Sequence, residues 1–184
     1  MGKSIVNAQL EQNNFLFVPN FISQEQAQAF NQEFFILERD NGCIKDEQAP
    51  KSSAVYNFKP FLELLCQKVS EVSKLIEEPV LPTYTYARIY KNGETLARHR
   101  DRPACEISLT VHIGGDTDWD ISIQKPSNEE VSLNLKQGDA MLYLGCTADH
   151  WRNTPFTGQN YSQVFLHYVR SNGPCAWAYF DKRN

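Results

Sequence analysis

His99 and Asp101 are separated by a single residue, and a second histidine, His150, follows much later in the chain. On an extended strand, residues two apart share a face, so His99 and Asp101 are expected to project together. If another strand brings His150 to the same place, the three side chains form a facial triad of two histidines and one carboxylate. That ligand set leaves coordination positions open and is typical of non-heme Fe(II) in oxygen chemistry. The three residues are therefore candidate catalytic residues and metal ligands.

The motif alone is a weak signal, because a single histidine is more often a packed or hydrogen-bonded structural residue than a ligand. All four histidines lie in the second half of the chain. We expect structural roles for His112 and His167. Whether His99 and His150 can bind a metal therefore depends on the elements that would bring them together.

The composition is that of an ordinary globular protein and predicts a single domain over residues 1–184. The net charge is −4, and the absence of a run of basic residues argues against nucleic acid as a partner. We also expect no membrane segment, because no apolar stretch is long enough to cross a bilayer. The five cysteines include no C-x-x-C pair, and with no apolar leader at the start we expect reduced thiols in a cytoplasmic protein.

Two helices are predicted before the core, in a supporting region of about residues 20–80. The first begins at a capping box formed by Ser23 and Gln26 and runs to about residue 39. The second begins at Pro60 and ends at Pro79, with apolar residues at helical spacing between them. Their apolar faces indicate that both helices cover a sheet.

The remaining pattern is one of short strands separated by turn residues. The predicted strands cover residues 15–18, 83–90, 96–99, 105–113, 119–123, 131–135, 140–144 and 161–169. Residues 43–59 show no periodicity and are expected to form a loop. Many short strands with turn signals between them favour a sandwich or barrel. The predicted fold class is therefore α+β and mainly β, with the β core over about residues 82–180.

Several segments of this core follow one another in a characteristic order. They are Arg88-Ile89-Tyr90-x-x-Gly93 before His99-x-Asp101, the strand 107–113, the turn Lys136-Gln137-Gly138-Asp139 before an apolar strand, and His150 followed by Pro155 and Gly158. In order and spacing they resemble the double-stranded β-helix, or jelly-roll, core of the Fe(II)/2-oxoglutarate-dependent oxygenases, most closely the prolyl-hydroxylase-like group. The resemblance covers about half of the chain by motif and most of it by architecture.

The resemblance implies a specific chemistry. His99, Asp101 and His150 would bind Fe(II), with 2-oxoglutarate as co-substrate and dioxygen as oxidant. The expected reaction is hydroxylation of a small-molecule or peptide substrate that the sequence does not identify. Loops over residues 43–59 and 114–128 would surround the mouth of the barrel.

One position departs from the pattern of the family. Its members carry an arginine or lysine about ten residues after the distal histidine, often within R-x-S, and this cation binds the far carboxylate of 2-oxoglutarate. Here Asn160 occupies that position, although Ser162 is present. An asparagine cannot form the bidentate ion pair. Either 2-oxoglutarate is not used, or the cation comes from another strand.

Arg152 is the best substitute for the missing cation, because it lies two residues after His150 and would share its face on a strand. We expect that strand to lie antiparallel beside the one that carries residue 160. Tyr90 and Arg88, which share a face of an earlier strand, could add to the same site. The candidate co-substrate residues are therefore Arg152, Tyr90, Ser162 and Arg88.

Two other classes of function stay open at this point. The protein could be a cupin-like metal-binding barrel with other chemistry, which the asparagine favours, or a non-catalytic binding module. Formation of succinate from 2-oxoglutarate would separate the first alternative from the oxygenase. If the protein bound no iron with the triad intact, the non-catalytic binding module would be favoured. The oligomeric state cannot be predicted from the sequence.

Overall fold

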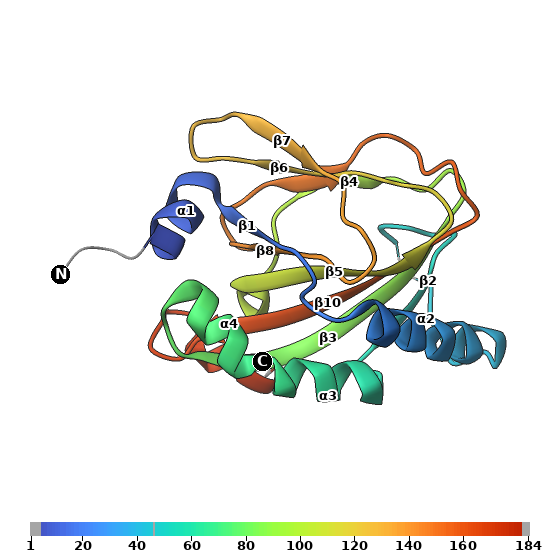
Figure 1. The fold of residues 1–184 in the computed structure, drawn as a ribbon, viewed down its shortest axis with the longest axis horizontal. Helices are drawn as coiled ribbons and strands as arrows, with labels where there is room; N and C mark the ends of the chain where they lie inside the picture. The colour runs from blue at the N-terminus through green and yellow to red at the C-terminus, as the bar shows by residue number, and fades with distance from the viewer. Residues whose placement is uncertain (1–4, 46, 182–184) are drawn as a thin grey trace.

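The computed structural model describes residues 5–45 and 47–181, in which two antiparallel sheets face each other and helices cover one of them (Figure 1). The helical segments are α1 (Ile5–Asn13), α2 (Gln24–Arg39), α3 (Lys59–Gln67), α4 (Val69–Ile76) and the 3-10 segments η1 (Pro103–Cys105) and η2 (Ala176–Asp181). The strands are β1 (Phe15–Val18), β2 (Ser53–Tyr56), β3 (Val80–Lys91), β4 (Leu96–His99), β5 (Ile107–Gly115), β6 (Ile121–Gln124), β7 (Glu130–Leu133), β8 (Ala140–Tyr143), β9 (His150–Arg152) and β10 (Asn160–Arg170).

The chain passes repeatedly from one sheet to the other. The larger sheet has the order β1-β8-β5-β10-β3-β2, and the smaller one has the order β4-β9-β6-β7. From β3 to β10, the chain leaves the larger sheet after β3, β5 and β8 and returns to it at β5, β8 and β10. Strands that are distant in sequence therefore become neighbours, and β4 and β9 are one such pair.

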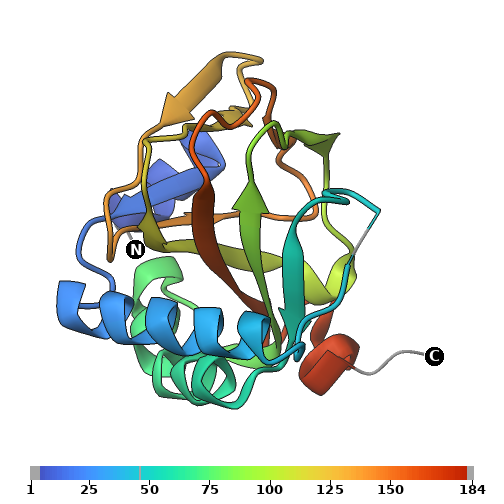
Figure 2. The ribbon, with the colours of Figure 1, turned by 90° about the vertical axis from the view of Figure 1, so that its right-hand side faces the viewer.

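The outer face of the larger sheet is covered by α2, α3 and α4, which lie together on the side opposite the smaller sheet (Figures 1 and 2). The capping box that was predicted at Ser23 and Gln26 is confirmed, with both reciprocal hydrogen bonds present. Phe34 of α2 and Phe61 of α3 are fully buried and meet edge to face, with ring centroids 5.6 Å apart. This helix layer supports the sheet and carries none of the predicted site residues.

The second predicted helix is interrupted, which corrects the expectation of one helix between Pro60 and Pro79. It divides at Lys68, which ends α3 and precedes α4. The Lys68 ammonium bonds the carbonyl of Phe21 and lies 2.6 Å from the carboxylate of Glu71. The contact with Phe21 ties the break to a distant segment, and the periodic apolar pattern continues across it because both halves cover the same sheet.

The predicted loop over residues 43–59 contains strand β2, a second correction. This strand pairs with β3, and Tyr56 lies opposite Tyr86. Its partner β3 lies far along the chain, so a local sequence pattern does not predict β2. Within residues 5–45 and 47–181, the structure has no helix with the length and apolarity needed to cross a membrane.

The two faces of the larger sheet differ in chemistry. On β3, Ala87 and Ile89 belong to the apolar core under the helices, whereas Tyr86 and Tyr90 belong to a different buried cluster between the sheets. Arg88 lies between Tyr86 and Tyr90 on the same face of β3 and points into the space between the sheets. The interior between the sheets is thus lined by aromatic and polar side chains, an unusual surface to bury unless it binds something.

Candidate metal centre and cavity

The two histidines of the predicted triad come from paired strands of the smaller sheet. His99 ends β4 and lies directly opposite His150, which begins β9. Asp101 lies just beyond β4, so it does not share a continuous strand with His99 as expected. Its backbone N–H donates to the carbonyl of Gly145 at 2.9 Å, which holds the segment after β4 against the turn after β8.

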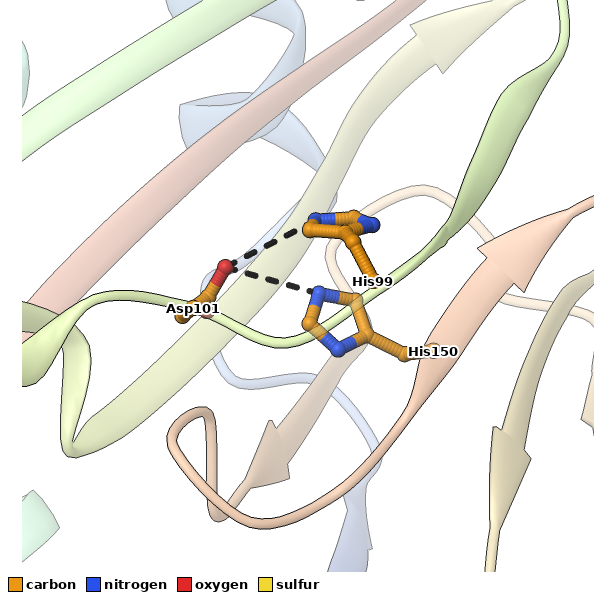
Figure 3. A group of neighbouring side chains, drawn as sticks. All are labelled: His99, Asp101 and His150. Atoms are coloured by element: carbon orange, nitrogen blue, oxygen red, sulfur yellow. Dashed lines mark ion pairs between the residues drawn. The ribbon is translucent and has the colours of Figure 1, made fainter.

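The three side chains converge on one point. Asp101 Oδ1 lies 3.6 Å from Nε2 of His99 and 3.6 Å from Nε2 of His150, as Figure 3 shows. The ligand atoms all lie within 4.8 Å of one another. Imidazole and carboxylate bond a divalent metal at about 2.0–2.2 Å in zinc sites. Atoms at this separation can therefore share one ion with little movement.

Both histidines are oriented by the backbone. The Nδ1 atom of His99 lies 2.8 Å from the carbonyl of Ala97, and that of His150 lies 3.0 Å from the carbonyl of Ala148. A carbonyl only accepts, so each Nδ1 carries the proton and each Nε2 presents a lone pair to the centre. Burial lowers the pKa of His150, which favours the neutral imidazole that a metal requires. The donor set thus fits a divalent metal.

The sequence matches no protein-family model and no curated protein. The fold, in contrast, matches solved structures. A prolyl-4-hydroxylase from Pseudomonas putida superposes with a TM-score of 0.72 at 12% identity, over 90% of this chain and 97% of the other. The non-heme α-ketoglutarate-dependent epimerase SnoN from nogalamycin biosynthesis gives a TM-score of 0.78 at 12% identity, over 97% and 88%.

A third match is HygX from Streptomyces hygroscopicus, with nickel, 2-oxoglutarate and hygromycin B bound. Its TM-score is 0.73 at 12% identity, over 93% of this chain and 88% of the other. This chain has the fold of the Fe/2-oxoglutarate-dependent oxygenases. The resemblance inferred from the sequence is thereby confirmed at the level of the fold.

The oxygenase fold here contains a cavity of about 470 Å³ between the two sheets, and the triad lies in its wall. The opposite wall is the inner face of the larger sheet, where strand pairing arranges side chains in rows. One row is aromatic and consists of Tyr56, Tyr86 and Phe165, from β2, β3 and β10. The cavity can therefore offer a metal on one side and flat apolar surfaces on the other.

The next row of the larger sheet is polar. Arg88, Gln163 and His112 lie side by side in the register of β3, β10 and β5. Arg88 is buried yet lines the cavity, and it donates to the Tyr90 hydroxyl at 3.2 Å and to Gln48 at 2.7 Å. Both side-chain polar atoms of Gln163 and the Nδ1 of His112 are buried without a hydrogen-bond partner in the described residues. Arg88 lines the cavity and His112 lines a separate pocket, so Arg88 is the candidate contact of this row for a polar ligand in the cavity.

Arg152 lies near this row but does not line the cavity. Only 1% of it is exposed, and its guanidinium stacks over the rings of Trp119 and Tyr161 at 4.5 and 4.9 Å. One nitrogen donates to the Trp119 carbonyl, and Nε and Nη2 have no hydrogen-bond partner within residues 5–45 and 47–181. Among the described residues no acidic group pairs with it within the ion-pair distance. The expected pairing of its strand with β10 is wrong, because β9 lies between β4 and β6 in the smaller sheet.

The structure does not bring Ser162 to the site. Ser162 lies opposite Ile89, whose side chain packs under the helices, so its hydroxyl is on the outer face of β10. Asn160 also faces outward, where its amide oxygen accepts from Lys91 at 2.8 Å. The inward position between them is Tyr161. A cation at position 160 would therefore have faced away from the cavity.

Two arginines beside the metal motif line the rim of the cavity. Arg100 is half-exposed and bonds Asp149 at 2.6 Å, and Arg102 bonds Asp181 at 2.6 Å. Sequence reasoning did not select the aromatic row or Ser108, which contacts Asp101. The usable signal was the period of two along β5 and β10, which places alternate residues on the inner face.

The buried histidines make stability depend on pH. Burial first, and then the nearby charge of Arg152, lowers the pKa of His112 to about 4, and burial lowers that of His167 to about 4. Between their ordinary pKa of 6.5 and about 4, the unfolded chain binds protons that the folded protein excludes. We therefore expect the free energy of unfolding to fall as the pH is lowered from about 6.5 to 4. Urea unfolding at pH 7 and pH 5 measures it.

The matched variant for this measurement is His112→Gln, which removes one of the two groups. Its unfolding free energy should depend less on pH than that of the wild type over the same interval. Equal dependence in both proteins would contradict the assignment of a neutral, buried His112.

Proposed function

We propose that the protein is an Fe(II)/2-oxoglutarate-dependent dioxygenase of one domain with a jelly-roll core, and that it hydroxylates a small-molecule or peptide substrate. The observation that carries the proposal is the convergence of two oriented imidazoles and one carboxylate on the wall of a cavity. The alternation of successive strands between two sheets supports the jelly-roll description.

The metal ligands in this proposal are His99, Asp101 and His150. They would hold the ion as a facial triad, and the cavity that they line would receive the co-substrate and dioxygen. Bound Fe(II), 2-oxoglutarate and dioxygen would together supply the oxidising chemistry, with the co-substrate converted to succinate and carbon dioxide. The contribution of the chain is to orient the ligands, exclude water and hold the substrate near the open side.

The far carboxylate of 2-oxoglutarate is assigned to Arg152. Removing the partner of a buried charge costs about 3–5 kcal/mol. The two rings that Arg152 contacts return about 0.5–2 kcal/mol each, so an anion is the natural complement. Arg152 and His150 are two residues apart on β9, which is about 6.6 Å at the usual strand rise. A five-carbon dicarboxylate that chelates a metal at His150 can span that distance.

Arg88 and Tyr90 are assigned to the middle of the same co-substrate, because Arg88 belongs to the polar row and donates a hydrogen bond to the Tyr90 hydroxyl. The aromatic row of Tyr56, Tyr86 and Phe165 is then left for the substrate. HygX with hygromycin B and a Trichoplax adhaerens prolyl hydroxylase with a peptide fragment show that this fold accommodates both kinds of molecule. The substrate itself is left open between these two kinds.

The test is direct and needs no substrate. Protein loaded with Fe(II) under anaerobic conditions is titrated with 2-oxoglutarate. Bidentate chelation by the 2-oxo acid is expected to give visible charge-transfer absorption, and admission of oxygen should yield succinate, measured by mass spectrometry. A protein that binds iron but produces neither the absorption nor succinate would favour a metal-dependent barrel with other chemistry. A protein that binds no iron would favour a binding module.

A further inference from the structure

A buried hydroxyl links the Asp101 carboxylate to a histidine outside the triad. Ser108, on β5, is fully buried and lies directly opposite His167 of β10 in the strand register. Its Oγ lies 3.2 Å from Asp101 Oδ2 and 2.9 Å from Nδ1 of His167. We propose that Ser108 and His167 are positioning residues that orient the Asp101 carboxylate, so that Oδ1 faces the metal. This inference rests on the proposed function.

The direction of the hydrogen bonds follows from the chemistry of the three groups. A carboxylate only accepts, so the single Ser108 proton goes to Asp101. The carbonyl of Cys105, at 3.0 Å, competes for that proton, but a charged oxygen is the stronger acceptor. Ser108 must then accept from His167, whose Nδ1 carries a proton. The chain therefore runs from His167 through Ser108 to Asp101.

The two oxygens of the carboxylate are thereby separated in role. Oδ1 is the atom that lies 3.6 Å from both Nε2 atoms, and Oδ2 is the atom held by Ser108. Without this bond, the carboxylate would be free to rotate about its terminal torsion, which has a broad energy minimum. The hydroxyl keeps one oxygen directed at the metal and discourages bidentate chelation, which would occupy a position that oxygen or co-substrate needs.

The backbone of Gly145 packs closely against the hydrogen bond between Ser108 and Asp101. A Cβ added to Gly145 would lie 2.7 Å from Asp101 Oδ2 and 3.0 Å from Ser108 Oγ, so the turn after β8 fits tightly around this pair. His167 is itself held by ring contacts with Tyr84, with centroids 4.5 Å apart. Ser108 and His167 thus hold the chain from the larger sheet, and Asp101 meets it from the segment after β4.

A different arrangement of the same groups is also testable. Ligand atoms of Asp101, Cys105 and His167 lie within 4.8 Å of one another and could hold a metal by themselves. However, the Ser108 hydroxyl already bonds two of these three residues. We therefore attribute their closeness to the hydrogen-bond chain.

The experiment is Co²⁺ titration of the metal-free full-length protein, followed by visible absorption, without co-substrate. Ser108→Ala is expected to raise the dissociation constant about tenfold, the lower end for partners that orient a ligand. Thr110→Ala is the matched control, because it removes a buried hydroxyl from the next inward position of β5, and that hydroxyl has no partner in the described residues. It should leave the dissociation constant within about twofold of the wild type.

His167→Phe keeps an aromatic ring at its position and removes the Nδ1 donor, so it should weaken Co²⁺ binding in the wild type but add little in Ser108→Ala. Equal effects in both backgrounds would overturn the chain. Ser108→Thr, which keeps the hydroxyl, should restore binding. If Ser108→Ala is unstable by circular dichroism, His167→Phe decides the question alone.

Other outcomes are equally clear. Unchanged Co²⁺ affinity and spectrum in Ser108→Ala and in His167→Phe would overturn the positioning role while leaving the proposed function intact. A thiolate charge-transfer band in the wild type that Cys105→Ser removes would place the metal on Cys105 and overturn it too. Failure of the wild type to bind Co²⁺, or binding insensitive to His99→Ala, would instead contradict the proposed function.

Discussion

Asp101→Asn is expected to lower the affinity for ferrous iron by at least about 100-fold, the upper end of what is lost when only a supporting partner is removed. Asp101 supplies the only negative charge among the three proposed ligands, and its Oδ1 faces both imidazoles at 3.6 Å. The amide retains the shape but neither the charge nor the basicity. Iron content after anaerobic loading, and the visible absorption on addition of 2-oxoglutarate, should both be lost.

Asp149→Asn is the matched control, because it neutralises the carboxylate next to His150 in sequence without touching the centre. Asp149 accepts hydrogen bonds from Arg100 at 2.6 Å and Arg98 at 3.3 Å at the surface. Surface pairs of this kind contribute about 0–1 kcal/mol, so iron content should stay near the wild-type value. If Asp101→Asn retained iron, the iron would have to be bound at another site.

Arg152→Met is expected to raise the concentration of 2-oxoglutarate needed for half-maximal succinate formation by at least about tenfold. A hydrogen bond to a charged group is worth about 1.5–3 kcal/mol, and 1.4 kcal/mol corresponds to a factor of ten. Methionine fills much of the same space, so the variant tests the charge more than the packing. The measurement is succinate formation at varied co-substrate concentration.

The same variant carries a second expectation that a structural ion pair would not produce. Arg152 is 1% exposed and, within the part of the chain that the structure describes, has no acidic partner. Replacing an unpaired buried charge by an apolar side chain is neutral or stabilising. The thermal midpoint of Arg152→Met without co-substrate should therefore equal or exceed that of the wild type, whereas the stabilisation conferred by 2-oxoglutarate should decrease.

Two arginine variants complete this experiment. Arg98→Met removes a cation from β4 that already pairs with Glu130 at 2.7 Å, and it should not change the co-substrate requirement. Arg88→Met distinguishes the two buried arginines. If it raises the requirement while Arg152→Met does not, the far carboxylate is held by Arg88, which lines the cavity, and the assignment to Arg152 is wrong.

The strand pattern predicted a mainly β fold, and the resemblance to the oxygenases added the prediction that His99, Asp101 and His150 lie together, which they do. The strand predicted over residues 96–99 has the bounds of β4, and the capping box at Ser23 is present. These features are local, since a period of two or of 3.6 is imposed by the geometry of the backbone itself. Local patterns are visible without knowledge of the partner.

The errors concern elements whose existence depends on distant contacts. Strand β2 forms because β3 offers it an edge, and the division at Lys68 is held by contacts with Phe21. The expectation that residue 160 faces the co-substrate site was wrong for a related reason. Which residues of β10 face inward is decided by pairing with both neighbours, and that pairing turns Asn160 outward and Tyr161 inward.

The amino-acid sequence by itself determined that this protein carries two histidines and a carboxylate on a β-rich core, and it placed eight of the ten described strands to within three residues at each end. Only the tertiary structure decided that Arg152 lies buried with no acidic partner among the described residues and that Ser108 joins Asp101 to His167. The physical reason is the range of the forces involved. Periodicity is written into neighbouring residues, whereas the pairing of a buried charge or hydroxyl depends on side chains that meet only when the two sheets face each other.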